Sequence, residues 1–66
     1  MTNNLKVLRA IKNVSQEELS KKIDVSRQTI NAMENSKYIP STLLALKLAR
    51  FFEIEVSAIF SLEATD

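Results

Sequence analysis

Residues 26–35, Ser-Arg-Gln-Thr-Ile-Asn-Ala-Met-Glu-Asn, read as a short helix with two different faces. The hydroxyl of Ser26 can cap this helix, because a serine at the first position accepts an unpaired backbone N–H of the first turn. At about 100° per residue, Ile30 and Met33 fall on one side and form an apolar face. The opposite side carries no carboxylate, which is unusual for a helix face that only meets water.

The outer face of this helix suits the major groove of duplex DNA. It presents four candidate base-contact residues, namely Gln28, Asn31, Ala32 and Asn35. Asn and Gln can pair with the edge of adenine through two hydrogen bonds, and an alanine methyl can rest on the methyl group of thymine. Arg27 lies beside this face, where a phosphate could bind. A polar surface helix that happens to carry amides is the alternative, and the helix alone does not separate the two interpretations.

Length and composition restrict the classes of protein to consider. The 66 residues predict one domain, 1–66, near the lower size limit for an unaided core. Cys and His are absent, so neither a disulfide nor a zinc site is expected. Without a Gly-rich phosphate loop or a catalytic cluster, we expect no enzyme activity and no cofactor. Gly is absent and Pro occurs once, which disfavours a turn-rich β fold.

Charge and hydropathy say less about partners. The net charge is only +1, so a case for nucleic acid depends on where the charges lie. No apolar run approaches the roughly 18 residues of a membrane span, and no signal peptide is visible. We therefore expect a cytoplasmic protein with no membrane partner. No sensor domain is visible, so no small-molecule ligand is indicated.

A second helix and a turn precede residues 26–35. Ser15-Gln16-Glu17-Glu18 is a capping box, in which a serine and a glutamate three positions later satisfy each other's backbone N–H groups. The helix that it starts is expected to run to about Lys22 and to bury Leu19 and Ile23. Asp24 and Val25 form the turn. Two short helices joined in this way predict a helix-turn-helix at about residues 16–35.

The outer segments predict three further helices. The first covers Leu5 to Lys12 and ends at Asn13, since Asn tolerates the left-handed conformation. Its residues Val7 and Ile11 form an apolar stripe beside the core face, and the C-terminal segment is a candidate partner for it. The other two helices cover Thr42 to Phe52, capped by Ser41 after the loop that contains Pro40, and Ser57 to Phe60. The tail, residues 61–66, is expected to be extended.

These pieces together resemble the Xre/Cro/C1 family of helix-turn-helix repressors over about residues 5–60. The matching motifs are Ser15-Gln16-Glu17-Glu18-Leu19, Val25-Ser26-Arg27-Gln28-Thr29-Ile30-Asn31, Glu34, Pro40-Ser41 and Lys47-Leu48-Ala49. The short length and the Lys-Tyr-x-Pro-Ser loop are most similar to the small stand-alone, cytolysin-repressor-like members. The resemblance implies an all-α, compact, five-helix lambda-repressor-like domain, a homodimer, and a small two-stranded sheet from the termini. Asp24 and Ser36 depart from the pattern, because the family often has Gly or Asn at these turns.

Helix geometry and the resemblance together predict roles for individual residues. The helix at 26–35 would lie in the major groove, with Gln28 as the first choice for a base contact and Asn31 as the second. The candidate phosphate contacts are Gln16, Ser26, Arg27, Thr29, Lys37 and Tyr38. In the family the residue equivalent to Gln16 also steadies the Gln of the reading helix, and an ion pair such as Arg9 with Glu34 often joins the first helix to the third. The alternatives are a plain helix-start residue for Gln16, a solvated Lys37, and a Tyr38 that packs over the Pro40 loop.

Apolar residues on the C-terminal half predict a dimer surface. Leu43 and Leu46 fall within the polar arc of the helix at 42–52, and Ile39 and Val56 are further apolar residues outside the core pattern. A two-fold dimer through about residues 39–60 would present two reading helices about 34 Å apart. We therefore expect a transcriptional regulator, a repressor that binds an inverted-repeat operator in double-stranded DNA. The alternative is an antitoxin-like or adaptor module on the same scaffold.

Overall fold

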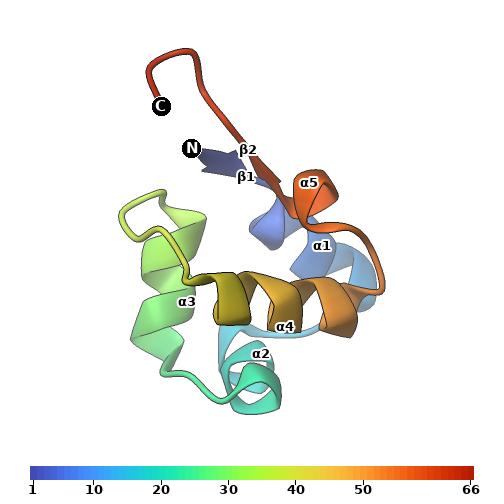
Figure 1. The fold of residues 1–66 in the computed structure, drawn as a ribbon. Coiled ribbons are helices and arrows are strands. Elements are labelled where there is room, and N and C mark those ends of the chain that lie inside the picture. Colours follow the sequence, from blue (N-terminus) through green and yellow to red (C-terminus); the bar gives the residue numbers. More distant parts are fainter.

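Five helices and two very short strands make up the computed structural model, which describes residues 1–66 (Figure 1). The helices are α1 (Leu5–Lys12), α2 (Gln16–Ile23), α3 (Arg27–Glu34), α4 (Thr42–Phe52) and α5 (Val56–Ile59). Strands β1 (Thr2–Asn3) and β2 (Phe60–Ser61) pair antiparallel and join the two ends of the chain. The predicted all-α fold with a small terminal sheet is confirmed. No helix has both the length and the apolar character needed to cross a bilayer.

Serine side chains begin three of the helices. The Oγ atoms of Ser15, Ser26 and Ser41 accept the backbone N–H of the residue three positions later, at 3.0, 3.1 and 3.2 Å. At Ser15 the capping box is complete, because its backbone N–H also donates to the carboxylate of Glu18 at 3.0 Å. These caps explain why the sequence pattern predicts the starts of α2, α3 and α4 to within a residue.

Left-handed residues end four helical segments, although the chain has no glycine. Asn13, Asp24, Ser36 and Glu53 all have φ between 57° and 59°. Asp24 and Ser36 therefore adopt the left-handed conformation that Gly takes most easily, at a cost of about 1–2 kcal/mol each. At Ser36 the following N–H, that of Lys37, closes the end of α3 on the carbonyl of Ala32 at 2.9 Å. The turn at Asp24 and the end of α3 both survive the departures from the family pattern.

All five helices contribute to one hydrophobic core. Its buried members are Leu5, Leu19, Ile23, Ile30, Met33, Leu44, Leu48, Ile59 and Phe60. Each fully buried aliphatic or aromatic side chain contributes about 1.5–3 kcal/mol to folding. Ile30 and Met33 bury one side of α3 in this core, so the opposite side of α3 faces outward.

Two details of the predicted fold are wrong. Phe60 belongs to β2 and not to the last helix, because it pairs with Asn3 of β1 in extended conformation. Val7 and Ile11 are not covered by the C-terminal segment and remain 59% and 77% exposed. The pairing of β2 with β1 carries the tail toward the N-terminus (Figure 1).

Candidate nucleic-acid interface

Helix α3 presents its polar face to the outside. Gln28, Asn31 and Asn35 are exposed, and Ala32 between them is half-buried. The core face of the same helix is closed, with Ile30 and Met33 at 0% and 1% exposure. Helix α3 therefore buries one side in the core and exposes the other side to solvent, as the sequence pattern predicts.

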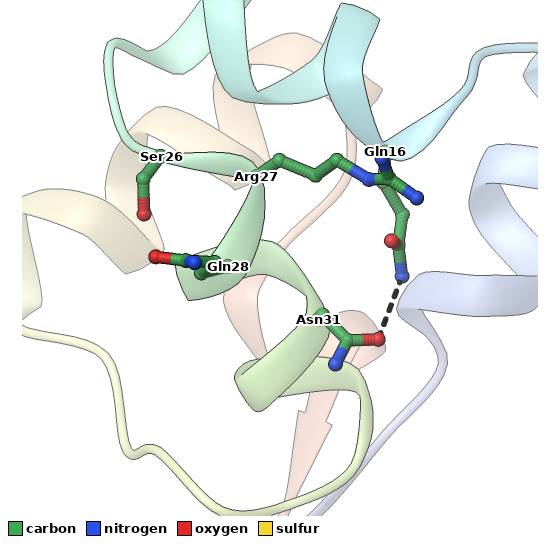
Figure 2. Close-up of a pocket in the computed structure, with 5 residues that line it drawn as sticks. All are labelled: Gln16, Ser26, Arg27, Gln28 and Asn31. Atoms are coloured by element: carbon green, nitrogen blue, oxygen red, sulfur yellow. Dashed lines mark hydrogen bonds between the residues drawn. The ribbon is translucent and has the colours of Figure 1, made fainter.

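A shallow hollow lies between the start of α2 and the outer face of α3 (Figure 2). Five residues line it, all of them polar: Gln16, Ser26, Arg27, Gln28 and Asn31. Figure 2 shows Arg27 reaching across toward Gln16, whereas Gln28 extends away from both. The hollow brings together two predicted base-contact residues and three predicted phosphate-contact residues from two helices.

A buried ion pair fixes the end of α3 to α1. The Arg9 guanidinium donates to both carboxylate oxygens of Glu34, through Nε to Oε2 and through Nη2 to Oε1 at 3.1 Å, and Nη1 donates to the carbonyl of Val14 at 3.1 Å. The Glu34 side chain is 1% exposed and that of Arg9 is 16% exposed. This pair orients α3 relative to α1 and removes the one carboxylate of α3 from the outer face.

The pKa of Glu34 is lowered by its partners. Burial by itself would raise the pKa of this carboxyl, but hydrogen bonds from Arg9 and Gln16, together with the charge of Arg9, outweigh burial. The same hydrogen bond raises the pKa of Arg9 further above neutrality. Both groups therefore remain charged at neutral pH.

Gln16 joins this ion pair to the outer face of α3. Its Nε2 donates to Glu34 Oε1 at 2.9 Å and to Asn31 Oδ1 at 3.3 Å (Figure 2). The resemblance implies that Gln16 steadies Gln28, but the structure places it against Asn31 and Glu34. Spacing along α3 does not decide this, because Gln28 and Glu34 are each three residues from Asn31; the way α2 crosses α3 puts Gln16 beside Asn31 and Glu34. The Gln16 amino group thus makes one part-buried and one exposed hydrogen bond within the protein, and its contact with a phosphate stays a prediction.

Asn35 folds back onto the last turn of α3. Its Nδ2 donates to the backbone carbonyl of Asn31 at 2.9 Å and lies 3.4 Å from Asn31 Oδ1. Among the predicted base contacts, Asn35 therefore has a helix-ending role in this structure, and only its side-chain oxygen is free of a partner.

The remaining predicted phosphate contacts lie at the two ends of α3. Ser26 Oγ caps the N-terminus and lies 2.9 Å from the hydroxyl of Thr29, so these two hydroxyls form one polar group beside Arg27. Lys37 and Tyr38 follow the C-terminus, where both are exposed, and Tyr38 keeps 43% of its surface open. Lys37 takes part in none of the ion pairs of the chain.

The predicted dimer residues form part of an apolar surface. Ile39, Leu43 and Leu46 are 71%, 64% and 55% exposed, whereas Val56 is half-buried against the core. A groove of about 230 Å³ brings Ile39, Leu46 and Val56 together, and Leu43 lies outside it. The other residues that line the groove, which the sequence pattern does not single out, are Met1, Pro40, Ser41, Thr42, Ala45 and Phe60.

The fold and the polar hollow define a helix-turn-helix protein. A sequence profile of the helix-turn-helix family matches residues 5–59, nearly the whole chain. The chain is 52% identical over 63 residues to an uncharacterized HTH-type transcriptional regulator of Methanocaldococcus jannaschii, and the match covers 96% of each chain. It is 44% identical over 63 residues to another, YgzD of Bacillus subtilis, again covering 96% of each. The protein belongs to the helix-turn-helix family of DNA-binding transcription regulators, and the Xre-type resemblance predicted from the motifs is confirmed.

Proposed function

We propose that this protein is a sequence-specific repressor that binds an inverted-repeat operator in double-stranded DNA as a homodimer. The observation that carries the proposal is the outer face of α3, which is held rigidly from below and presents amides without any carboxylate. Gln28 and Asn31 are exposed on it, and Arg27 stands at its N-terminal edge. Amide side chains on a helix of this width fit base edges in the major groove.

The electrostatics of this face favour a polyanion. The only carboxylate on α3, that of Glu34, is buried and neutralised by Arg9. Arg27 lies at one end of the helix and Lys37 beyond the other, so a cation flanks each end of the reading surface. Contacts from these cations and from Ser26 and Thr29 to phosphates would set the register, and the groove contacts would specify the sequence.

The apolar groove supports a dimer of this chain. Ile39, Leu43 and Leu46 expose more than half of their surfaces on one side of α4 and the loop before it. The groove brings Ile39 and Leu46 together with Val56, and a contiguous apolar patch is typical of a site of association. A two-fold axis through it would pair identical grooves and present two copies of α3 to the two halves of a palindromic site.

Repression requires nothing beyond these two surfaces. A dimer bound across a promoter would exclude the polymerase from it, so repression needs no further surface. The proposed phosphate contacts supply sequence-independent affinity, and Gln28 supplies the first element of specificity.

The test is selection of bound sequences from random duplex DNA, with sedimentation of the free protein in parallel. We expect an enriched inverted repeat whose half-site centres lie about 34 Å apart, and a sedimenting dimer at micromolar concentration. Failure to enrich any sequence, together with binding to a protein partner, would instead favour the antitoxin-like or adaptor function.

A further inference from the structure

Three amides at the reading surface have orientations that their partners determine. Gln16 must direct its Nε2 at Glu34 Oε1, 2.9 Å away, because a carboxylate paired with Arg9 can only accept a hydrogen bond. Asn35 must direct its Nδ2 at the backbone carbonyl of Asn31, 2.9 Å away, for the same reason. The orientations of the Gln16 and Asn35 amides are therefore fixed without any contribution from the side chain of Asn31.

The second protons of these two amino groups converge on one atom. Asn31 Oδ1 lies 3.3 Å from Gln16 Nε2 and 3.4 Å from Asn35 Nδ2. Each contact is long for a hydrogen bond, but a reversed Asn31 amide would set its own donors against two others. Asn31 is thus held with its oxygen toward Gln16 and its amino group pointing away from Gln16, as Figure 2 shows.

We propose that Asn31 reads guanine, and that Gln16 is the positioning residue that restricts it to this base. The inference rests on the proposed function, since it concerns the DNA that α3 would bind. An Asn that pairs with adenine needs a free oxygen to accept from the N6 amino group, as well as a free amino group. Both lone pairs of Asn31 Oδ1 already face donors from Gln16 and Asn35, so that mode is closed.

The edge of guanine matches the amino group of Asn31, which remains free to donate. Guanine presents two acceptors, N7 and O6, to the two protons of the outward Nδ2. Cytosine offers only an amino donor, which would oppose the amino group of Asn31, and thymine offers a single acceptor beside a bulky methyl. Gln28 has no partner that restricts its amide, so it retains the two-bond mode that suits adenine. Two amides one turn apart on α3 would therefore specify different bases.

The test compares sequences selected from random duplex DNA by the wild type, Asn31→Ala and Gln16→Met, with Gln28→Ala as the control. We expect Asn31→Ala to lose selectivity at one G·C pair in each half-site. Replacing that guanine with 7-deazaguanine, which lacks the N7 acceptor, should weaken wild-type binding roughly tenfold and leave Asn31→Ala unchanged. Gln28→Ala should lose selectivity at a different pair and keep the response to 7-deazaguanine.

Gln16→Met separates positioning from a general structural effect. Met keeps the length of the side chain but removes both donors, so the Asn31 oxygen keeps only the long 3.4 Å contact from Asn35 and its amide is held less firmly. We expect the preference for G·C over A·T at the Asn31 position to fall toward parity, while the Gln28 position keeps its preference. An equal loss of affinity for all duplexes, with the G·C preference retained, would overturn the positioning role.

The other outcomes are equally distinct. An A·T pair at the position that depends on Asn31, or a G·C pair that is insensitive to 7-deazaguanine, would overturn the guanine assignment while leaving the regulator function intact. If the wild type enriches no sequence at all, the proposed function falls, and this inference falls with it.

Discussion

Replacing Arg9 with alanine should destabilise the protein more than the loss of any exposed charge. Arg9 makes two hydrogen bonds to Glu34 and one to the carbonyl of Val14. Its removal leaves a carboxylate that is 1% exposed with Gln16 as its remaining donor. The change therefore acts through a stranded buried charge and not through the loss of a surface ion pair.

The structure sets the expected size of this effect. Removing one partner of a buried pair costs roughly 3–5 kcal/mol. Because Gln16 still donates to Glu34 and Arg9 is partly exposed, we expect the lower end, about 3 kcal/mol. A chain of this length has a total stability of roughly 3–10 kcal/mol, so the loss is a large share of it. The unfolding midpoint should fall by about 12–24 °C.

Thermal unfolding followed by circular dichroism, at one fixed protein concentration, measures this effect. Arg50→Ala is the matched control, since Arg50 is exposed and makes no ion pair, and it should cost less than about 1 kcal/mol. The double change Arg9→Met with Glu34→Leu should recover most of the loss, because it removes the buried charge as well as its partner. A midpoint in Arg9→Ala within about 4 °C of the wild type would refute the reasoning.

Three further predictions follow from the same structure. Lys37→Ala should weaken binding to all duplexes alike and reduce the slope of log K against log salt by about one unit, measured by fluorescence anisotropy; a loss confined to one sequence would contradict a phosphate role. Leu46→Glu should sediment as a folded monomer with much weaker operator binding. The control Leu62→Glu changes an exposed leucine outside the groove and should remain a dimer. A dimeric Leu46→Glu would exclude this interface. Since the folded-state pKa of Glu34 is lowered, its carboxylate contributes stability that is present at neutral pH and is lost as pH falls through that pKa. Denaturant unfolding between about pH 5 and pH 2 should therefore show a smaller fall in stability for Glu34→Gln than for the wild type, and equal slopes would argue against this linkage.

The helices follow from local physics and could be predicted from the sequence. Ser15, Ser26 and Ser41 each start a helix, and the period of the apolar residues predicts which side is buried. The terminal sheet is different, because strands of two residues carry no periodic pattern. Only the family resemblance predicts it, and for that reason Phe60 is wrongly expected in the last helix.

Tertiary geometry determines what the sequence pattern could not. Val7 and Ile11 share a helical stripe, but a stripe does not say whether another element lies over it, and none does. Gln16 has amide partners available at Gln28 and Asn31, and the choice between them depends on how α2 crosses α3. The hydrogen bond from Arg9 to the carbonyl of Val14 could not be predicted from the sequence either, because any residue type supplies a backbone carbonyl.

The most direct test of the central claim is a parallel selection from random duplex DNA with the wild type and with Gln28→Ala. The claim is that the outer face of α3 reads the major groove, with Gln28 as its leading contact. We expect the same length and two-fold symmetry in both consensus sequences, loss of preference at one base pair in each half-site, and a cost of about 1–3 kcal/mol on the wild-type operator. An unchanged consensus in Gln28→Ala would contradict the claim that α3 reads the DNA in this way.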